Sequence, residues 1–325
     1  MERSNTGSSR TVVKKLLNKY AIYIIFVGMC VILSLLTPNF LKMRNILNVI
    51  RQVCVFGTIG LGVTLCIITA GTDLSAGSVA ACAGIVSAIF AQRGGGVNLL
   101  LAIVLGVLTG ALAGLINGVL IVKGEIPPFI ATLGMMSAAR GAALLISKGL
   151  PISNLDEAYI VIGQGDILGI PVPIIIFAVL AVIMHITLSK TKFGRSVYAV
   201  GGNPLAAVTC GINKNKILIE VYLLEGVMCG IAGIILTSRV GSGVPTAALN
   251  YEFDAITGAI IGGTSFNGGI GTVMGTVVGV LVIGVLNNGM DLLAISSYWQ
   301  QVVKGVVIVL AVILDARKNK VFLGK

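Results

Sequence analysis

The chain has 325 residues, of which 56% are hydrophobic and 11% are charged, with a formal net charge of +11 at pH 7. Soluble domains carry roughly 25% charged residues, so this composition excludes a soluble globular enzyme and indicates a protein embedded in a lipid bilayer. In a soluble protein so basic a charge would indicate a nucleic-acid partner. Here most Lys and Arg residues lie outside the apolar runs, so membrane topology explains them and no nucleic acid is expected.

Apolar segments follow one another along the whole chain, and most approach the ~20 residues that span a bilayer as a helix. The sequence therefore predicts an all-α, polytopic membrane protein with about ten transmembrane helices, both termini being cytoplasmic. The segment at 253–263 is short, so eight or nine full spans with a re-entrant piece is the alternative. The predicted spans are 20–38, 46–70, 76–92, 97–122, 128–147, 172–189, 217–238, 253–263, 272–290 and 298–315.

The orientation follows from the distribution of Lys and Arg, which are enriched in cytoplasmic loops. With both termini inside, a cytoplasmic tail at 1–19 precedes a transmembrane domain at 20–315, and a second tail follows at 316–325. The long basic loop at 190–216 is then also cytoplasmic. The outer loops hold only Lys42, Arg44, Arg51, Arg93, Lys148 and Arg239.

Two glycine-rich breaks interrupt the apolar segments, one at Gly71–Val79 and one at Gly262–Val273. They share the pattern G-T-x-x-[S/N]-x-G, which could record an internal duplication of the kind found in transporters. Non-helical backbone at membrane depth is tolerated where protein or water surrounds it, so both breaks are expected to line a path or an inner gate. Their candidate pathway residues are Asp73, Ser75, Thr264 and Asn267.

The loop KTKFGRSVYAVGGNPLAAVTCGI, which begins at Lys190, is polar and basic in an otherwise apolar chain. Small residues at Ala206, Ala207 and Gly211 are expected to let a partner approach the backbone closely, and Gly211 can end a helical turn. This pattern predicts that the membrane protein is driven by a cytoplasmic partner. The chain has no glycine-rich phosphate-binding loop of its own, so neither ATP hydrolysis nor a cofactor is expected on it.

With this loop and both breaks, the chain resembles the membrane permease subunit of ABC sugar importers of the ribose/galactose type. The resemblance extends from residue 37 to residue 315, and its matching segments include TPNFLKMRNILNVIRQ, ITAGTDLSAGSV, NGVLIVKGEIPPFIATLGMM, YEFDAITGAIIGGTSFNGGIGTVMGT and GVLNNGMDLLAISSYWQQVVKGVVIVLAV.

The resemblance implies several partners: a separate cytoplasmic ABC ATPase, an extracytoplasmic sugar-binding protein, and a second permease copy, in a homodimer or a heterodimer. It also implies a multi-pass protein of the bacterial cytoplasmic (inner) membrane. Many such permeases have a glutamate before the two alanines, where this chain has Leu205. The ATPase-coupling residues that the resemblance assigns are Gly201, Gly202, Asn203, Pro204, Ala206, Ala207 and Gly211.

Neutral amides within the spans can bind sugar hydroxyls weakly, as transport requires, but they can equally join two helices by hydrogen bonds. Asn117, Asn287 and Asn288 are the candidates for the path. Charged residues in spans are functional candidates because charge is expensive in a bilayer, and for Lys304 and Glu225 an ion pair is the alternative to sugar contact.

The function expected is therefore a permease subunit for a monosaccharide, ribose first, galactose second and other pentoses or hexoses next. A branched-chain amino-acid ABC permease is the near alternative. A proton-coupled sugar symporter would need a carboxylate relay, for which Glu225 with Asp73 is the best pair available. An intramembrane enzyme is disfavoured because the spans hold no His/Glu, Ser/Lys or paired-Asp constellation.

Overall fold

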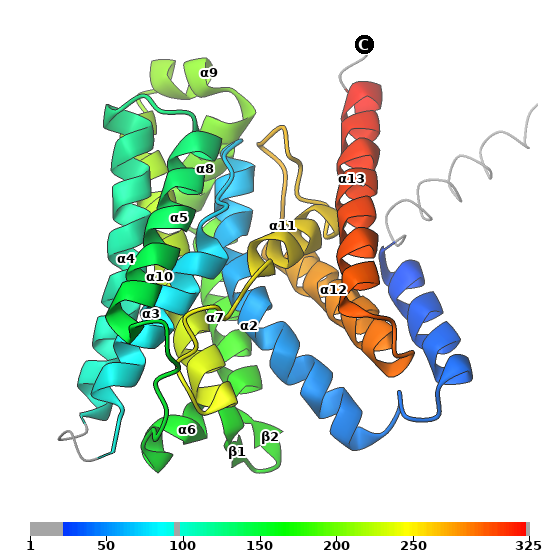
Figure 1. The fold of residues 1–325 in the computed structure, drawn as a ribbon. Coiled ribbons are helices and arrows are strands. Elements are labelled where there is room, and N and C mark those ends of the chain that lie inside the picture. The colour runs from blue at the N-terminus through cyan, green and yellow to red at the C-terminus, as the bar shows by residue number, and fades with distance from the viewer. Residues whose placement is uncertain (1–21, 94–97, 323–325) are drawn as a thin grey trace, which may run out of the picture.

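The structure is a computed structural model that describes residues 22–93 and 98–322, and almost all of its regular elements are helices (Figure 1). The predicted tail at 1–19 lies outside the described residues. The first described helix covers Ile22–Leu36. After it come α2 (Met43–Ile68), α3 (Ala76–Phe90), α4 (Leu99–Lys123), α5 (Pro128–Ser147), α6 (Glu157–Gln164), α7 (Val172–Lys190), α8 (Lys192–Gly202), α9 (Pro204–Thr209), α10 (Lys214–Val240), α11 (Tyr251–Ile261), α12 (Val273–Leu292) and α13 (Ser297–Phe322).

Two short strands, β1 (Asp166–Ile167) and β2 (Ile170–Pro171), pair antiparallel between α6 and α7. They belong to the loop that leads from α5 to α7, at the end of the molecule opposite to α8 and α9 (Figure 1). The prediction of a mostly helical, polytopic protein is confirmed, with this small hairpin as its one addition among the described residues.

In the described part of the chain, six helices are long and apolar enough to cross a membrane: α2, α4, α5, α7, α10 and α12. The helix Ile22–Leu36, α3 and the apolar part of α13 are shorter apolar helices. α11 has 11 residues, or about 16 Å at 1.5 Å per residue, against a hydrocarbon thickness of ~30 Å. This length favours the re-entrant alternative for 253–263. α13 continues to Phe322, past the predicted end of the transmembrane domain at 315.

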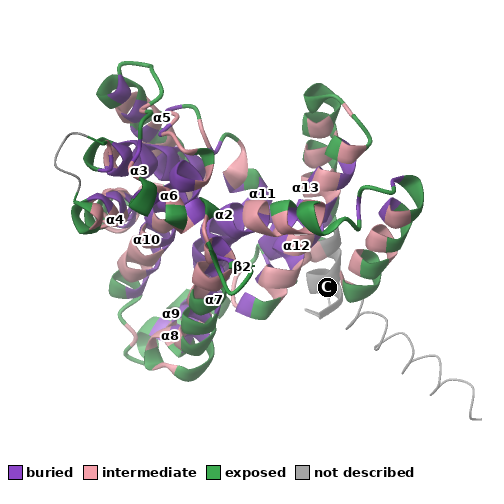
Figure 2. Cartoon of the chain, turned by 90° about the horizontal axis from the view of Figure 1, so that it is seen from below, coloured by how far each residue is buried: buried purple, intermediate pink, exposed green. Residues whose placement is uncertain are grey.

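The core lies around α2 and α10, which pack against each other and against α3. Figure 2 shows buried residues gathered along these central helices, while the outlying ones are exposed on their outward faces. From Val53 to Ile68, α2 carries no charged side chain and every residue is buried. A helical segment without a polar face belongs inside a bundle, so this part of α2 forms the axis of the bundle.

α4 is held against α10 by glycines spaced four residues apart on one helical face. Gly106, Gly110, Gly114 and Gly118 are all buried. A methyl group added at Gly110 would overlap the backbone carbonyl of Gly226 on α10. In a membrane, where lipid is as apolar as Leu, helices gain from such close backbone approach. The abundance of glycine in the sequence is therefore explained by helix packing here.

α13 and the helix Ile22–Leu36 stand at the edge of the bundle (Figure 1). Their outward side chains are apolar and exposed, including Leu35, Val302 and Val309. Trp299 and Tyr298 are exposed at the start of α13, where aromatic residues commonly anchor a helix at the membrane interface.

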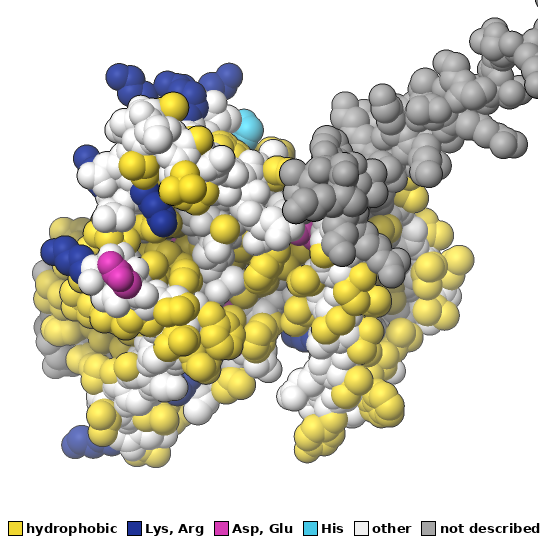
Figure 3. Space-filling view, turned by 90° about the horizontal axis from the view of Figure 1, so that it is seen from above, with side chains coloured by type: hydrophobic (Ala, Val, Ile, Leu, Met, Phe, Trp, Pro, Cys, Tyr) yellow, Lys and Arg dark blue, Asp and Glu magenta, His cyan; other side chains and the backbone are white. Residues whose placement is uncertain are grey.

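Basic side chains gather on the end of the molecule that carries α8 and α9 (Figure 3). The exposed ones are Lys123, Lys190, Lys192, Arg195, Lys214 and Lys216. They surround the segment that the sequence predicted to meet a cytoplasmic partner.

Candidate functional site

The predicted coupling loop folds into two consecutive helices, α8 and α9, which we call the coupling segment (Lys192–Gly211). Asn203 separates them: its Oδ1 accepts a hydrogen bond from the backbone N–H of Ala206 at 3.0 Å, which caps the N-terminus of α9. Pro204 occupies the first turn, where its missing N–H leaves no bond unmade. Gly211 follows the helix with φ +81°, the left-handed conformation that ends such a turn.

The face that α9 offers to a partner differs from the one expected. Ala207 is only 4% exposed and packs against its own chain, whereas Leu205 is 82% exposed and Val208 is 53% exposed. The sequence grouped Ala206, Ala207 and Gly211 as one small-residue contact face. Because α9 lies across the end of the bundle, Ala207 is instead turned inward, and the outward face is an apolar projection built around Leu205 and Val208.

The second glycine break, far from the first in sequence, contacts the end of α2, just before the first break begins at Gly71. The backbone N–H of Gly269 donates to the carbonyl oxygen of Ile68, the last residue of α2, at 2.8 Å. In the second break, Thr264 is fully buried and its hydroxyl has no hydrogen-bond partner among the described residues. Asn267 is exposed, with its backbone N–H bonded to Ser265 Oγ at 3.2 Å.

Three of the predicted pathway residues meet at the first break. Oδ1 of Asp73 accepts hydrogen bonds from the backbone N–H and the hydroxyl of Ser75, both at 2.6 Å. The side-chain amide of Asn117, on α4, donates to Asp73 Oδ2 at 3.3 Å and to Ser75 Oγ at 3.1 Å. All three residues are 0% exposed. In this state of the protein, Asp73 fixes the broken backbone and joins it to α4.

Glu225, the partner that a proton relay with Asp73 would use, is buried on α10 and accepts a hydrogen bond from Cys229 Sγ at 2.8 Å. Near it, the hydroxyl of Tyr222 donates to the carbonyl of Thr72 in the first break at 3.2 Å. The polar groups around the first break are thus satisfied largely by protein, apart from Asn117 Oδ1, which lacks a partner in the described part of the chain.

The neighbouring residues Asn287 and Asn288 belong to different clusters. Asn288 and Asn45 exchange two side-chain hydrogen bonds of 2.9 Å each, which join α12 to α2. Asn287 points the other way and donates to Asp254 Oδ2 on α11 at 3.4 Å. The same oxygen pairs with Lys304 Nζ on α13 at 2.9 Å.

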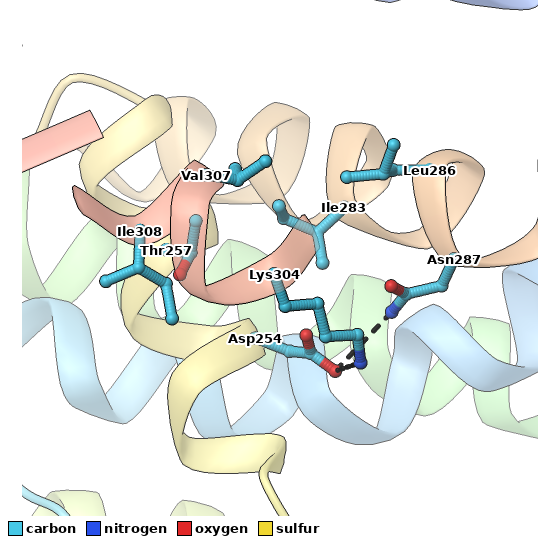
Figure 4. Close-up of a pocket in the computed structure, with 8 residues that line it drawn as sticks. All are labelled: Asp254, Thr257, Ile283, Leu286, Asn287, Lys304, Val307 and Ile308. Atoms are coloured by element: carbon cyan, nitrogen blue, oxygen red, sulfur yellow. Dashed lines mark hydrogen bonds and ion pairs between the residues drawn. The ribbon is translucent and has the colours of Figure 1, made fainter. Parts of the chain in front are cut away.

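These last three residues line a pocket between α11, α12 and α13 (Figure 4). Its other walls are Thr257 and the aliphatic side chains of Ile283, Leu286, Val307 and Ile308. The cavity measures about 10 Å³, room for the centre of one water molecule or one hydroxyl group. Asn287 is 4% exposed, and its Oδ1 has no partner among the described residues.

Sequence reasoning identified Asn287 and Lys304 but did not single out Asp254. The signal that could have found it is its position inside the apolar segment 253–263, since a carboxylate within a span requires a partner. That partner, Lys304, lies 50 residues later.

Comparison with known proteins agrees with this architecture. The family described as branched-chain amino acid transport system / permease component matches residues 45–312. The ribose import permease protein RbsC of Bacillus subtilis is 45% identical over 291 residues, which cover 89% of this chain and 90% of that protein. RbsC of Escherichia coli K12 is 42% identical, with the same coverage of 89% and 90%. The D-allose transport system permease protein AlsC of E. coli is 37% identical and covers 93% of each chain.

No solved structure matches this chain. The family match extends over most of the chain, and the relatives align with it almost end to end, so the resemblance stated from the motifs is confirmed. The apolar helices and the sequence relatives together show that this chain is a multi-pass membrane protein and a permease subunit, not an enzyme, and that it belongs to the branched-chain amino acid transport system permease family.

Proposed function

We propose that this chain is the membrane permease subunit of an ATP-driven importer for a monosaccharide, with ribose as the first candidate. The observation that carries the proposal is the match, over about nine-tenths of both chains, to proteins named as ribose import permeases. Relatives named for D-allose and L-arabinose transport are less similar, at 37% and 36% identity.

The proposed partners are a separate cytoplasmic ABC ATPase, an extracytoplasmic sugar-binding protein and a second permease copy. We place the protein in the bacterial inner membrane, with both termini and the coupling segment in the cytoplasm. The basic side chains around α8 and α9 support this orientation, since positive charge is enriched on cytoplasmic loops.

In this proposal α9 docks on the ATPase through Leu205 and Val208. An apolar projection ringed by Lys and Arg fits a cleft with an apolar floor and an acidic rim. Gly201, Gly202, Asn203, Pro204, Ala206, Ala207 and Gly211 shape and support this projection, which is the coupling role proposed for them.

The sugar path is proposed to include the pocket of Asp254, Asn287 and Lys304. A carboxylate, an ammonium group and a free amide oxygen can bind hydroxyls, and the neighbouring aliphatic side chains can contact the C–H face of a sugar. Because the cavity admits one hydroxyl group, the pocket would hold part of a passing sugar rather than enclose it. Asp73, Ser75, Asn117, Thr264, Asn267 and Asn288 are proposed to shape the inner gate and the walls of the path rather than this pocket.

The test is uptake of labelled ribose by cells that carry or lack this gene, with excess unlabelled galactose, D-allose or leucine as competitors. Gene-dependent ribose uptake that none of the three suppresses supports a ribose permease. Suppression by D-allose or galactose reassigns the sugar, and suppression by leucine would contradict the monosaccharide proposal.

A further inference from the structure

The coupling segment is not attached to the membrane domain by its ends alone. The last turn of α8, just before α9, lies against the second glycine break and against the end of α2, which leads into the first break. Gly201 is buried, and a methyl group added to it would overlap the carbonyl oxygen of Ile68 and lie 2.8 Å from the backbone nitrogen of Gly269. Three backbones that are far apart in sequence therefore meet at one point. We call this point the inner junction: Ile68–Ala70, Tyr198–Gly202 and Gly268–Gly271.

The inner junction is closed by hydrogen bonds as well as by contact. The hydroxyl of Tyr198, on α8, donates to the carbonyl oxygen of Gly271 at 2.7 Å. Gly269, held at φ +74°, donates to Ile68 at 2.8 Å. Burial raises the pKa of the Tyr198 phenol above its usual value, so the hydroxyl stays protonated and remains a donor at neutral pH.

The second break is held from the other side by α13. Oδ2 of Asp315 accepts a hydrogen bond from the backbone N–H of Phe266 at 2.9 Å and another from Ser265 Oγ at 3.2 Å. The segment 262–272 is thus connected to α8 by Tyr198 and to α13 by Asp315. A displacement of α8 reaches this segment directly, because close-packed backbones transmit movement rather than absorb it.

We propose that Tyr198 and Gly201 are the residues through which movement of the coupling segment reaches the two glycine breaks. Tyr198 is a positioning residue: it pulls on the carbonyl of Gly271, while the close contact at Gly201 pushes on Ile68. This inference rests on the proposed function, since it requires an ATPase that moves α9 and a sugar that passes the breaks.

The experiment uses the complete importer, which is this permease with its ATPase and sugar-binding protein in proteoliposomes. Transported ribose and hydrolysed ATP are measured in the same preparation. Tyr198→Phe keeps the ring and removes only the hydroxyl, so the ATPase is expected to co-purify and hydrolyse ATP as before. The amount of ribose transported per ATP is expected to fall about fivefold, the factor that one lost neutral hydrogen bond represents.

Tyr298→Phe is the matched control, because Tyr298 is 80% exposed at the far end of α13. Its ratio of ribose transported to ATP hydrolysed should equal that of the wild type. A normal ratio for Tyr198→Phe would overturn the proposal. If Tyr198→Phe does not accumulate, Gly201→Ala tests the other contact, with Gly141→Ala as its control because a methyl group there meets nothing within 4 Å. A Gly201→Ala protein that keeps a wild-type ratio would equally overturn the proposal.

Failure of the proposed function would be visible before any variant is compared. In that case the wild-type chain would bind no ATPase or transport no monosaccharide. A lower amount of ribose transported per ATP in Tyr198→Phe, with ATPase association and hydrolysis intact, is specific to the inner junction. A merely structural role would lower association, hydrolysis and transport together.

Discussion

Lys304 and Asp254 form an ion pair of 2.9 Å that joins α13 to α11, with side chains 25% and 5% exposed. α13 stands at the edge of the bundle, and this bond is one of its ties to the short helix in the interior. A charge pair in an apolar segment is costly to form and more costly to break, because removing one partner leaves the other buried and uncompensated.

Lys304→Met is therefore expected to destabilise the protein by about 3 kcal/mol, the lower end for loss of one partner of a buried pair. The double variant Asp254→Asn with Lys304→Met should recover most of that loss, since both charges are gone. Thermal unfolding in detergent measures both effects, with Lys42→Met, at an exposed position, as the control. A single variant as stable as the wild type would contradict the importance of the pair.

The same double variant separates a structural role from a role in the path. If the pair only holds the helices, the rescued protein should take up ribose with an unchanged KM. If Asp254 and Lys304 bind hydroxyl groups of the sugar, as proposed, the KM for ribose should rise by about tenfold while stability is restored. A tenfold rise corresponds to the loss of about one to two hydrogen bonds.

Leu205 and Ala207 lie on opposite faces of α9, so substitutions at the two positions should have different effects. Leu205→Asp places a charge on the 82% exposed apolar projection, so co-purification of the ATPase should fall by about tenfold or more while the permease remains folded. Ala207→Arg should instead lower the yield of folded permease, because Ala207 is 4% exposed and has no room for a large side chain.

Leu168→Asp is the control for Leu205→Asp: Leu168 is 99% exposed, and it lies between β1 and β2 at the opposite end of the molecule. Pull-down of the ATPase and gel filtration of the permease report association and folding separately. Loss of the ATPase with Leu168→Asp, and its retention with Leu205→Asp, would reverse the proposed orientation.

The native cysteine Cys210 can be labelled chemically to test the membrane topology, without introducing a new cysteine. Of the six cysteines, Cys210 is exposed, Cys30 is half-buried and the other four are buried. Cys210 follows α9 directly, so a membrane-impermeant maleimide should modify it in inside-out vesicles and leave it unmodified in intact cells. Cys210→Ser should abolish the labelling, and labelling from the outside would invert the topology.

Much of the architecture could be predicted from the sequence because membrane helices are specified locally. A bilayer requires every spanning segment to be apolar and to satisfy its own backbone, so each helix shows in the sequence as a run of apolar residues. The run at 172–189 corresponds to α7 at Val172–Lys190, and the run at 128–147 corresponds to α5 at Pro128–Ser147. The end of the turn at Gly211 could also be predicted, because a glycine in the left-handed conformation ends α9 through local geometry.

Which residues meet across the bundle was decided by the tertiary structure alone. Nothing near Tyr198 in the sequence indicates that its hydroxyl reaches Gly271, 73 residues away, or that Asp254 pairs with Lys304. The inward turn of Ala207 likewise depends on how α9 lies across the ends of other helices. Apolar runs and helix caps are determined by neighbouring residues along the chain. These contacts instead follow from helix packing, because glycines let distant backbones touch and polar groups buried between helices must find partners on other helices.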